Sequence, residues 1–248
     1  MAGKLGKLPP KFNRKTLILF KYADPDAVPT PPVKTYWEYM VKEWPMMLND
    51  QLGCCVFACG GHMVQNWTAH AGKLITPADA VIESAYEAVG GYVPGNPATD
   101  NGASITDFCA WWQANGFAGV QIVGWAKIDQ TNLTAVKQAV FMFGALDIGF
   151  EVPQSALDQF DAGETWDVVA DDGGIQGGHS VCVLGYGADG FACITWGKIQ
   201  YMTNAFFAKY CDEGYALLTQ SWLDTAGVSP IAGLNLAQLQ ADLAAVRA

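Results

Sequence analysis

The chain has 248 residues, of which 51% are hydrophobic and 15% are charged, a composition typical of a globular protein with a sparsely charged surface. Its 24 acidic and 14 basic residues give a net charge of −10 at pH 7. This balance argues against nucleic-acid binding, because phosphate contacts need clustered lysine and arginine. No apolar run reaches the roughly 18–20 residues of a membrane span, so the sequence predicts no membrane segment.

The cysteines and the N-terminus bear on the compartment. Seven cysteines occur at no regular spacing, and the first residues lack the apolar stretch and small-residue cleavage site of a secretory signal. Disulfide frameworks belong to oxidising compartments. We therefore expect reduced thiols and a cytoplasmic location, without secretion through a signal peptide.

The first 35 residues differ in composition from the rest of the chain. Residues 1–23 hold six basic residues and no acid, whereas the remainder carries 24 acids against 8 bases. Six prolines between positions 9 and 32 disfavour a helix and favour polyproline-like or turn backbone. The sequence predicts an extended, proline-rich basic arm over residues 1–35, either solvated or docked, for example on an acidic neighbouring subunit. Residues 36–248 are expected to form a single domain.

Helical patterns dominate the first half of that domain, from about residue 49 to about residue 145. Apolar spacing, capping residues and terminal glycines predict four helices, at Cys55–Ala71, Thr76–Gly90, Ser104–Asn115 and Leu133–Phe143. A strand is predicted between the last two, at Val120–Ile128.

The period changes in the second half, from about residue 146 to about residue 222. Strands are predicted at Ala145–Val152, Ser180–Tyr186, Phe191–Trp196 and Tyr215–Leu218, with a short helix around Asn204–Cys211 and a C-terminal helix at about residues 235–246. The acids and glycines of residues 155–178 predict a surface loop. The order of elements indicates an α+β protein, in which a helical half packs against an antiparallel sheet half.

Two segments carry the residues that point to chemistry. Gln51–Cys55 places Cys55 where a loop enters an apolar helix, and Gly177–Val181 places His179 at the start of a strand. A helix N-terminus and a nearby imidazole are common means of turning a thiol into a nucleophile. The alternatives are an inert buried thiol and a core histidine whose hydrogen bonds are satisfied.

The order of these segments resembles the papain-like cysteine peptidases, over about Asn49 to Leu218. The sequence of Gln51–Cys55 is similar to the Gln-Leu-Gly-Ser-Cys of bacterial members, and the wider pattern resembles uncharacterised papain-like proteins of bacteria and their phages. The resemblance implies a papain-like fold, Cys55 as the nucleophile, and His179 as the base that takes its proton and returns it to the leaving group. It also implies a peptide or protein substrate and no cofactor.

The supporting residues depart from the family pattern. The family places a glutamine that binds the oxyanion six residues before the nucleophile, a position held here by Asn49, while Gln51 lies four residues before. Either amide could donate, with the backbone N–H of Cys55 as the second donor, and turn formation explains both residues equally well. The family also has an asparagine that orients the histidine; counting from His179 this position is Thr195, and counting back from Trp196 it is Ile194. The Thr195 hydroxyl could accept a hydrogen bond but is a weaker orienting group.

Two other patterns lead to no site. Cys55, Cys59 and His62 form a stripe of soft metal ligands, but three ligands from one helix rarely converge on one tetrahedral ion, so packing is the favoured interpretation and no metal is expected. The glycines of Gly185–Gly190 match a dinucleotide fingerprint, but they lie in a predicted hairpin rather than between a strand and a helix.

The sequence therefore leaves two functions open. The first is a thiol hydrolase acting on peptide or isopeptide bonds through Cys55 and His179. The second is a papain-fold structural or assembly protein without catalysis, for example a phage virion component, with homo- or hetero-oligomeric contacts made through residues 1–35. The substitution by Thr195 and the segregated basic arm favour the second function, and the motifs around Cys55 and His179 favour the first.

Overall fold

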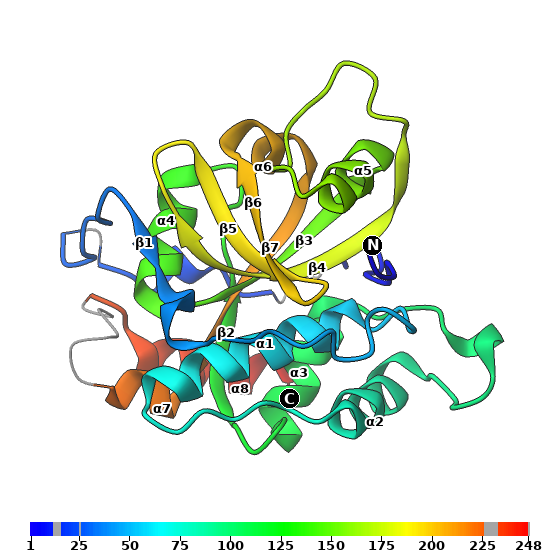
Figure 1. The fold of residues 1–248 in the computed structure, drawn as a ribbon. Coiled ribbons are helices and arrows are strands. Elements are labelled where there is room, and N and C mark those ends of the chain that lie inside the picture. Colours follow the sequence, from blue (N-terminus) through cyan, green and yellow to red (C-terminus); the bar gives the residue numbers. More distant parts are fainter. Residues whose placement is uncertain (12–15, 25, 226–232, 248) are drawn as a thin grey trace.

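The chain folds as an α+β structure in which helices pack around one antiparallel sheet (Figure 1). The computed structural model describes residues 1–11, 16–24, 26–225 and 233–247. Its α-helices are α1 Cys55–His70, α2 Asp79–Gly90, α3 Ile105–Asn115, α4 Leu133–Phe143, α5 Gln154–Ala162, α6 Asn204–Tyr210, α7 Gln220–Asp224 and α8 Leu236–Arg247. Its 3-10 helices are Leu19–Lys21, Trp37–Met40 and Pro97–Thr99.

The sheet has seven strands that run in the order β2-β7-β3-β4-β5-β6, with β1 paired to β4 beside this path. The strands are β1 Thr35–Tyr36, β2 Ile122–Lys127, β3 Leu146–Pro153, β4 Ile175–Tyr186, β5 Gly190–Thr195, β6 Lys198–Thr203 and β7 Cys211–Thr219. All their pairings are antiparallel. The predicted hairpin forms β4 and β5, so His179 and Thr195 lie on neighbouring strands.

Helix α1 is the central helix of the molecule. All its residues except His70 are buried, because β4 covers one side and α2 and α3 cover the other. Gly60 lets α1 and α3 pack closely, since a Cβ at this position would come within 2.6 Å of the Phe108 ring on α3. A helix that is apolar on all sides belongs in the core. Its first residue, Cys55, therefore begins at the seam between the helical layer and the sheet.

The helix and strand predictions agree with the structure for most elements, with the following differences. The predicted loop at residues 155–178 is wrong, because it contains most of α5 and the start of β4. Ala156 and Phe160, one helical turn apart, are the buried residues of α5, and the acids around them hid this short apolar stripe. Helix α2 begins at Asp79, and its N-cap, Ala78, makes no side-chain cap. Strand β6 and helix α7 were not predicted.

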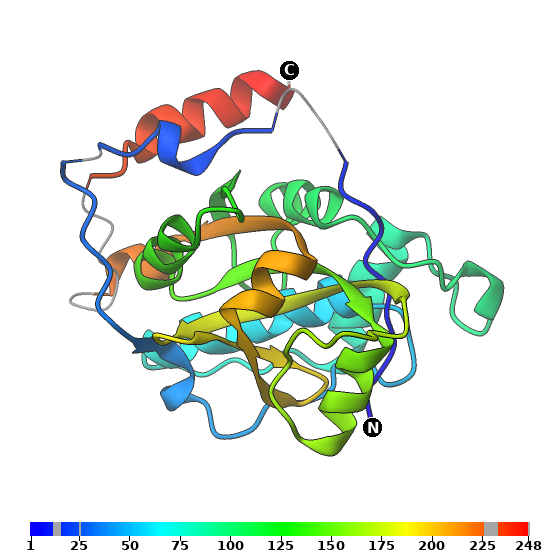
Figure 2. The same cartoon turned by 90° about the horizontal axis from the view of Figure 1, so that it is seen from above.

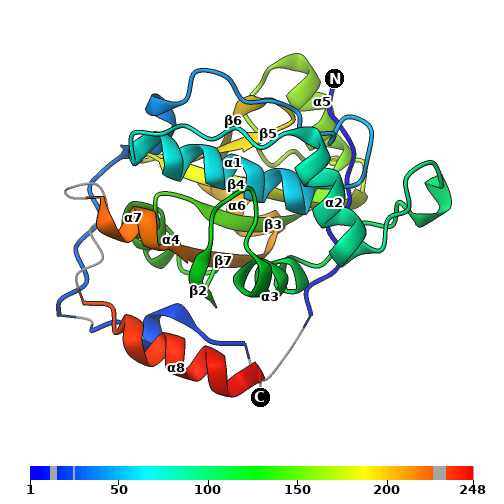
Figure 3. The same ribbon diagram turned by 90° about the horizontal axis from the view of Figure 1, so that it is seen from below.

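The N-terminal arm wraps around the body of its own chain (Figures 2 and 3). Ile18 forms a bridge with Lys127 of β2, and the Tyr22 hydroxyl donates to Asp242 of α8 at 2.8 Å. Strand β1 then pairs with β4. The first eleven residues, which we call the N-terminal segment, pass between the helical layer and the sheet, beside α5 and β4.

Candidate active site

Cys55 is the first residue of α1, and its side chain is buried. The N-cap, Cys54, makes no side-chain cap, so the free backbone N–H groups of the first turn and the helix dipole favour negative charge there. The backbone N–H groups of Ser180 on β4 and of Gly6 in the N-terminal segment lie close enough to the Cys55 sulfur to lower the pKa of its thiol. The thiol therefore lies directly against the strand that carries His179.

His179 is held by two neighbours from the β5 end of the hairpin. Its Nε2 lies 2.6 Å from the Thr195 hydroxyl, and the Trp196 ring stacks on it with a centroid distance of 4.4 Å. Trp196 has a φ of 44°, which turns the chain sharply after β5. His179 Nδ1 is buried and has no hydrogen-bond partner among the described residues. With the proton on Nε2, where the hydroxyl accepts it, Nδ1 is free to take a proton.

Both groups are uncharged at neutral pH in this state. Burial raises the pKa of the Cys55 thiol to about 11, against the lowering effect of the two N–H groups on its sulfur. Burial lowers the pKa of the His179 imidazole to about 3, and His62 and the charge of Lys7 act in the same direction. Desolvation by the surrounding chain thus holds the pair as a thiol and a neutral imidazole.

The two oxyanion candidates differ in position. Asn49 is buried, and its Nδ2 donates to the carbonyl oxygens of Lys4 at 2.9 Å and Leu52 at 3.1 Å. Trp196 Nε1 donates to the same Lys4 oxygen at 3.4 Å. Gln51 is exposed, and its amide contacts Asp50. Asn49 therefore lies where a peptide carbonyl oxygen enters the groove, and Gln51 lies outside it.

The N-terminal segment runs through this groove as an extended chain. On the sheet side, the N–H groups of Gly6 and Lys7 donate to the Gly178 carbonyl at 3.0 and 2.9 Å. On the helical side, Ala103 N–H donates to the Gly6 carbonyl and Leu8 N–H donates to the Ala103 carbonyl, both at 2.9 Å. The groove thus binds a polypeptide backbone from both walls, as an added strand is bound.

Glycine at position 6 makes this docking sterically feasible. A Cβ on Gly6 would overlap the backbone carbonyl of Gly53, in the loop that leads into Cys55. On the opposite wall, a Cβ on Gly178 would overlap the Lys7 carbonyl. Both obstacles are backbone atoms, which cannot move aside as a side-chain tip can.

Three lysines of the N-terminal segment pair with acids of the same chain. Lys4 pairs with Asp100, Lys7 with Asp212 and Glu213, and Lys11 with Asp107. The Lys4 and Lys11 side chains are about half exposed, whereas the Lys7 side chain is only 1% exposed. In the structure the basic arm is therefore docked on its own acidic body.

Asp100 organises the loop before the nucleophile and was not singled out by the sequence. Its Oδ1 accepts from Gly53 N–H at 2.8 Å and from the Tyr86 hydroxyl at 2.7 Å. Its Oδ2 accepts from Lys4 at 3.2 Å. Asp100 thus joins the Cys55 loop to α2 and to the N-terminal segment. Its position in a polar loop resembled that of any solvated acid, so only the fold shows its contacts.

The stripe of Cys55, Cys59 and His62 is not assembled as a metal site. His62 Nε2 lies 2.9 Å from the Pro45 carbonyl, and Cys59 lies against Asp147 on β3. Within the ranges that the structure describes, no group of three or more histidine, cysteine or acidic side chains is arranged to hold a metal ion. Those same ranges contain no helix with the length and apolar character to cross a bilayer.

Solved structures with a similar fold include cysteine proteases. Xylellain, a cysteine protease of Xylella fastidiosa, superposes with a TM-score of 0.69 at 13% identity, covering 88% of this chain and 96% of that one. The chain has a papain-like peptidase fold. The cysteine protease and lectin-like domains of Cwp84 from Clostridium difficile match with a TM-score of 0.60 at 12% identity, over 88% of this chain and 56% of that one. Procathepsin B S9 of Trypanosoma congolense matches with a TM-score of 0.56 at 13% identity, over 88% of this chain and 86% of that one.

The likeness is structural only. No protein-family model matches the sequence, and no curated protein matches it. The papain-like fold predicted from the motifs around Cys55 and His179 is thus confirmed by structure, at an identity that shows the fold and leaves the chemistry to be argued from the site.

Proposed function

We propose that the chain is a papain-like thiol hydrolase that cleaves peptide or isopeptide bonds with Cys55 and His179. The observation that supports this most directly is the polypeptide already bound across the thiol. The groove holds the N-terminal segment through backbone hydrogen bonds in which the Gly178 carbonyl accepts and Ala103 both donates and accepts. Such bonds recognise any extended chain regardless of its side chains.

The proposed reaction uses atoms whose positions are described above. His179 Nδ1 takes the thiol proton, and the Cys55 sulfur attacks the carbonyl carbon of the substrate. Asn49 Nδ2 and the backbone N–H of Cys55 stabilise the oxyanion. The imidazolium then protonates the leaving amine, a thioester forms, and water activated by the same imidazole hydrolyses it. Throughout the reaction the Thr195 hydroxyl accepts a hydrogen bond from the Nε2–H group of His179, which keeps the ring oriented.

The N-terminal segment blocks this reaction in the docked state. It places the backbone N–H of Gly6 close to the Cys55 sulfur, where a substrate would have to bind. The carbonyl oxygen that meets the Asn49 amide belongs to Lys4, two residues earlier. Hydrolysis of another peptide therefore requires that the segment first leave the groove, which also rehydrates the thiol and the imidazole.

The Gly6→Ala variant tests the proposal, because the added Cβ excludes the segment from the groove. We expect iodoacetamide to alkylate Cys55 faster than in the parent chain, and at a lower pH than the alkaline range set by a pKa of about 11. We also expect the variant to hydrolyse fluorogenic peptides, and both gains to vanish on adding His179→Ala. Hydrogen exchange at Lys7 and Leu8 verifies that the segment has been displaced, and Lys11→Ala is the matched control.

The proposal fails if the segment is displaced and Cys55 still reacts no faster than the other buried thiols. In that case the alternative gains support, a papain-fold structural or assembly protein, as in a virion. Its specific observations are Thr195 in place of an orienting asparagine and the lack of a thiol–imidazole hydrogen bond among the described residues. Under the alternative, the arm released in the Gly6→Ala variant should bind other copies of the chain. Analytical ultracentrifugation would detect the resulting oligomers.

A further inference from the structure

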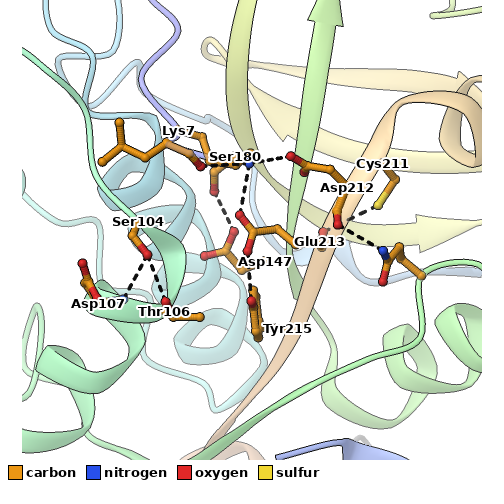
Figure 4. A network of polar contacts seen from close by, with 12 residues as sticks. Lys7, Ser104, Thr106, Asp107, Asp147, Ser180, Cys211, Asp212, Glu213 and Tyr215 are labelled. Atoms are coloured by element: carbon orange, nitrogen blue, oxygen red, sulfur yellow. Dashed lines mark hydrogen bonds and ion pairs between the residues drawn. The ribbon is translucent and has the colours of Figure 1, made fainter. Parts of the chain in front are cut away.

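A pocket with two carboxylates lies beside the thiol and is filled by the Lys7 side chain (Figure 4). The ammonium nitrogen lies 2.8 Å from Asp212 Oδ2 and 3.1 Å from Glu213 Oε1. It also donates to the Leu8 carbonyl at 3.1 Å. All three donors of the ammonium are therefore satisfied.

A β-bulge brings both acids to one point. Successive side chains of a strand face opposite sides, so Asp212 and Glu213 would diverge in a regular β7. The register with β3 shifts here, with Gly149 opposite Glu213 and Phe150 opposite Cys211. Asp212 is the extra residue, and such a bulge redirects its side chain.

The aliphatic part of Lys7 also has a prepared space. A Cβ on Gly149 would lie 2.7 Å from Lys7 Cδ and 2.8 Å from Glu213 Cγ, so any other residue there would fill the pocket. Tyr215 donates to Glu213 Oε2 at 2.9 Å and holds that carboxylate in place. The pocket is thus shaped for a long, unbranched side chain that ends in a cation.

The pocket requires positive charge. Burial alone would lower the pKa of Lys7, but the charges of Glu213 and Asp212 and the hydrogen bonds to them raise it above its ordinary value. Burial raises the pKa of Glu213 despite the neighbouring ammonium. Two acids face one cation, so an empty or neutral occupant would leave buried carboxylates without compensation.

The pocket lies where a substrate side chain would enter. Lys7 N–H donates to the Gly178 carbonyl, and the preceding amide, of Gly6, reaches the Cys55 sulfur. A substrate bound to the same wall atoms would direct a side chain into this pocket within a residue or two of its scissile bond.

We propose that this is the specificity pocket of the hydrolase, which binds a lysine or arginine side chain of the substrate once the N-terminal segment has left. The inference rests on the proposed function. Two carboxylates can accept from an ammonium or from the fork of a guanidinium. The rest of the chain, with 24 acids against 8 bases after residue 23, also attracts basic peptides.

The first experiment needs no catalysis. In full-length Lys7→Ala, propylammonium replaces the missing part of the side chain, and propanol is its neutral counterpart. We expect saturating propylammonium to raise the Tm by about 2–4 °C and propanol to leave it unchanged. The rise should vanish when Asp212→Asn and Glu213→Gln are added, and should be missing in Lys11→Ala, whose lysine pairs at the surface.

The second experiment measures preference in Gly6→Ala, in which Lys7 itself is displaced with the segment. Fluorogenic peptides that differ at one position carry lysine, arginine or norleucine, and the position is scanned across the scissile bond. We expect kcat/KM to be roughly 10- to 100-fold higher for a basic residue at one position, the size of one or two charge-assisted hydrogen bonds. With Asp212→Asn and Glu213→Gln the preference should be lost while norleucine peptides are still cleaved.

The outcomes separate the two proposals. Cleavage without a basic preference overturns the specificity pocket and leaves the hydrolase intact. Lack of cleavage together with an unreactive Cys55 overturns the hydrolase, and with it the pocket's role in substrate selection. Equal rescue by propanol, or rescue that survives removal of both carboxylates, overturns the cation pocket whatever the catalytic result.

Discussion

The thiol–imidazole pair and the Lys7 pocket lie under the same N-terminal segment, yet burial affects them in opposite ways. Cys55 and His179 lose their charges on burial, with pKa values of about 11 and about 3. Lys7 keeps its charge because two carboxylates surround it. A buried ionisable group stays charged only with a partner of opposite sign. The buried ion pairs of Lys7 therefore hold the N-terminal segment over the uncharged Cys55 and His179.

The largest effect is expected from Lys7→Met, which keeps the length of the side chain and removes the charge. Breaking one side of a buried ion pair costs about 3–5 kcal/mol, so the segment should open and the Cys55 alkylation rate should rise steeply. Glu213 should take up a proton in this variant, since its compensating charge is gone. Adding Glu213→Gln should cost less than the sum of the two single changes. An unchanged alkylation rate would mean that the lysine does not hold the segment.

Asp147 gives the next largest effect, because it is a buried acid whose hydrogen-bond partner is the Ser180 hydroxyl and not a cation. Burial raises its pKa to about 7, above its ordinary value in the unfolded chain. As the pH rises from 4 to 7, the unfolded chain releases this proton and the folded chain retains it, so stability falls by about 1.4 kcal/mol per pH unit, up to about 4 kcal/mol. Asp147→Asn can still accept from the Ser180 hydroxyl, which lies 2.6 Å away.

Denaturant unfolding of Asp147→Asn and the parent at pH 4.5 and 7.5 measures this difference. The stability gained by the variant should be small at pH 4.5 and should grow up to about pH 7, then level off. A gain that is the same at both pH values would show that Asp147 does not titrate between the folded and unfolded chains in this range.

Asn49→Ala tests the assignment of Asn49 as a donor to the oxyanion beside Cys55 and His179. In the Gly6→Ala background it removes one donor to the oxyanion and should lower kcat by about 10²–10³, with little change in KM. Gln51→Ala is the matched control, since Gln51 is exposed and contacts Asp50, and it should change kcat by less than about twofold. Equal losses in the two variants would contradict the assignment of Asn49.

Lys11→Ala gives the smallest effect, although it removes the same charge from the same segment as a change at Lys7. The Lys11 and Asp107 side chains are about half exposed, and exposed ion pairs contribute about 0–1 kcal/mol. Alkylation of Cys55 should therefore stay within a few-fold of the parent rate. A large increase would show that charge alone, and not its burial, holds the segment.

The elements that were predicted correctly are those with strong local signals. Helices α3 and α4 follow the N-caps Ser104 and Asn132, whose side chains accept hydrogen bonds from backbone N–H groups of the first turn. The α5 region was predicted wrongly because its stability depends on the contact of Phe160 with the Trp196 ring, and on Trp166, which donates to the Ala156 carbonyl. Such contacts do not show in a local pattern.

The candidate site divides in the same way. Cys55, His179 and Thr195 occur in short motifs, and the sequence places each beside an element that forms locally. Asp212 and Glu213 precede a strand as two ordinary acids, and only a register shift against Gly149 and Phe150 turns both toward one cation. The sequence also did not determine where the arm docks, because its lysines can pair with acids on any acidic surface.

The sequence by itself determined the α+β order of elements, the helix that begins at Cys55 and the hairpin that joins His179 to Thr195, because periodicity, caps and turns act over a few residues. The papain-like architecture was implied by the resemblance of the motifs around Cys55 and His179. The tertiary structure alone decided that the basic arm lies in its own groove, with Gly6 over the thiol and Lys7 between two acids. The contacts of Lys7 join residues 205 and 206 positions apart, and the docking of the arm depends on the space left by glycines and on the desolvation of facing charges. Such quantities exist only after the chain has folded.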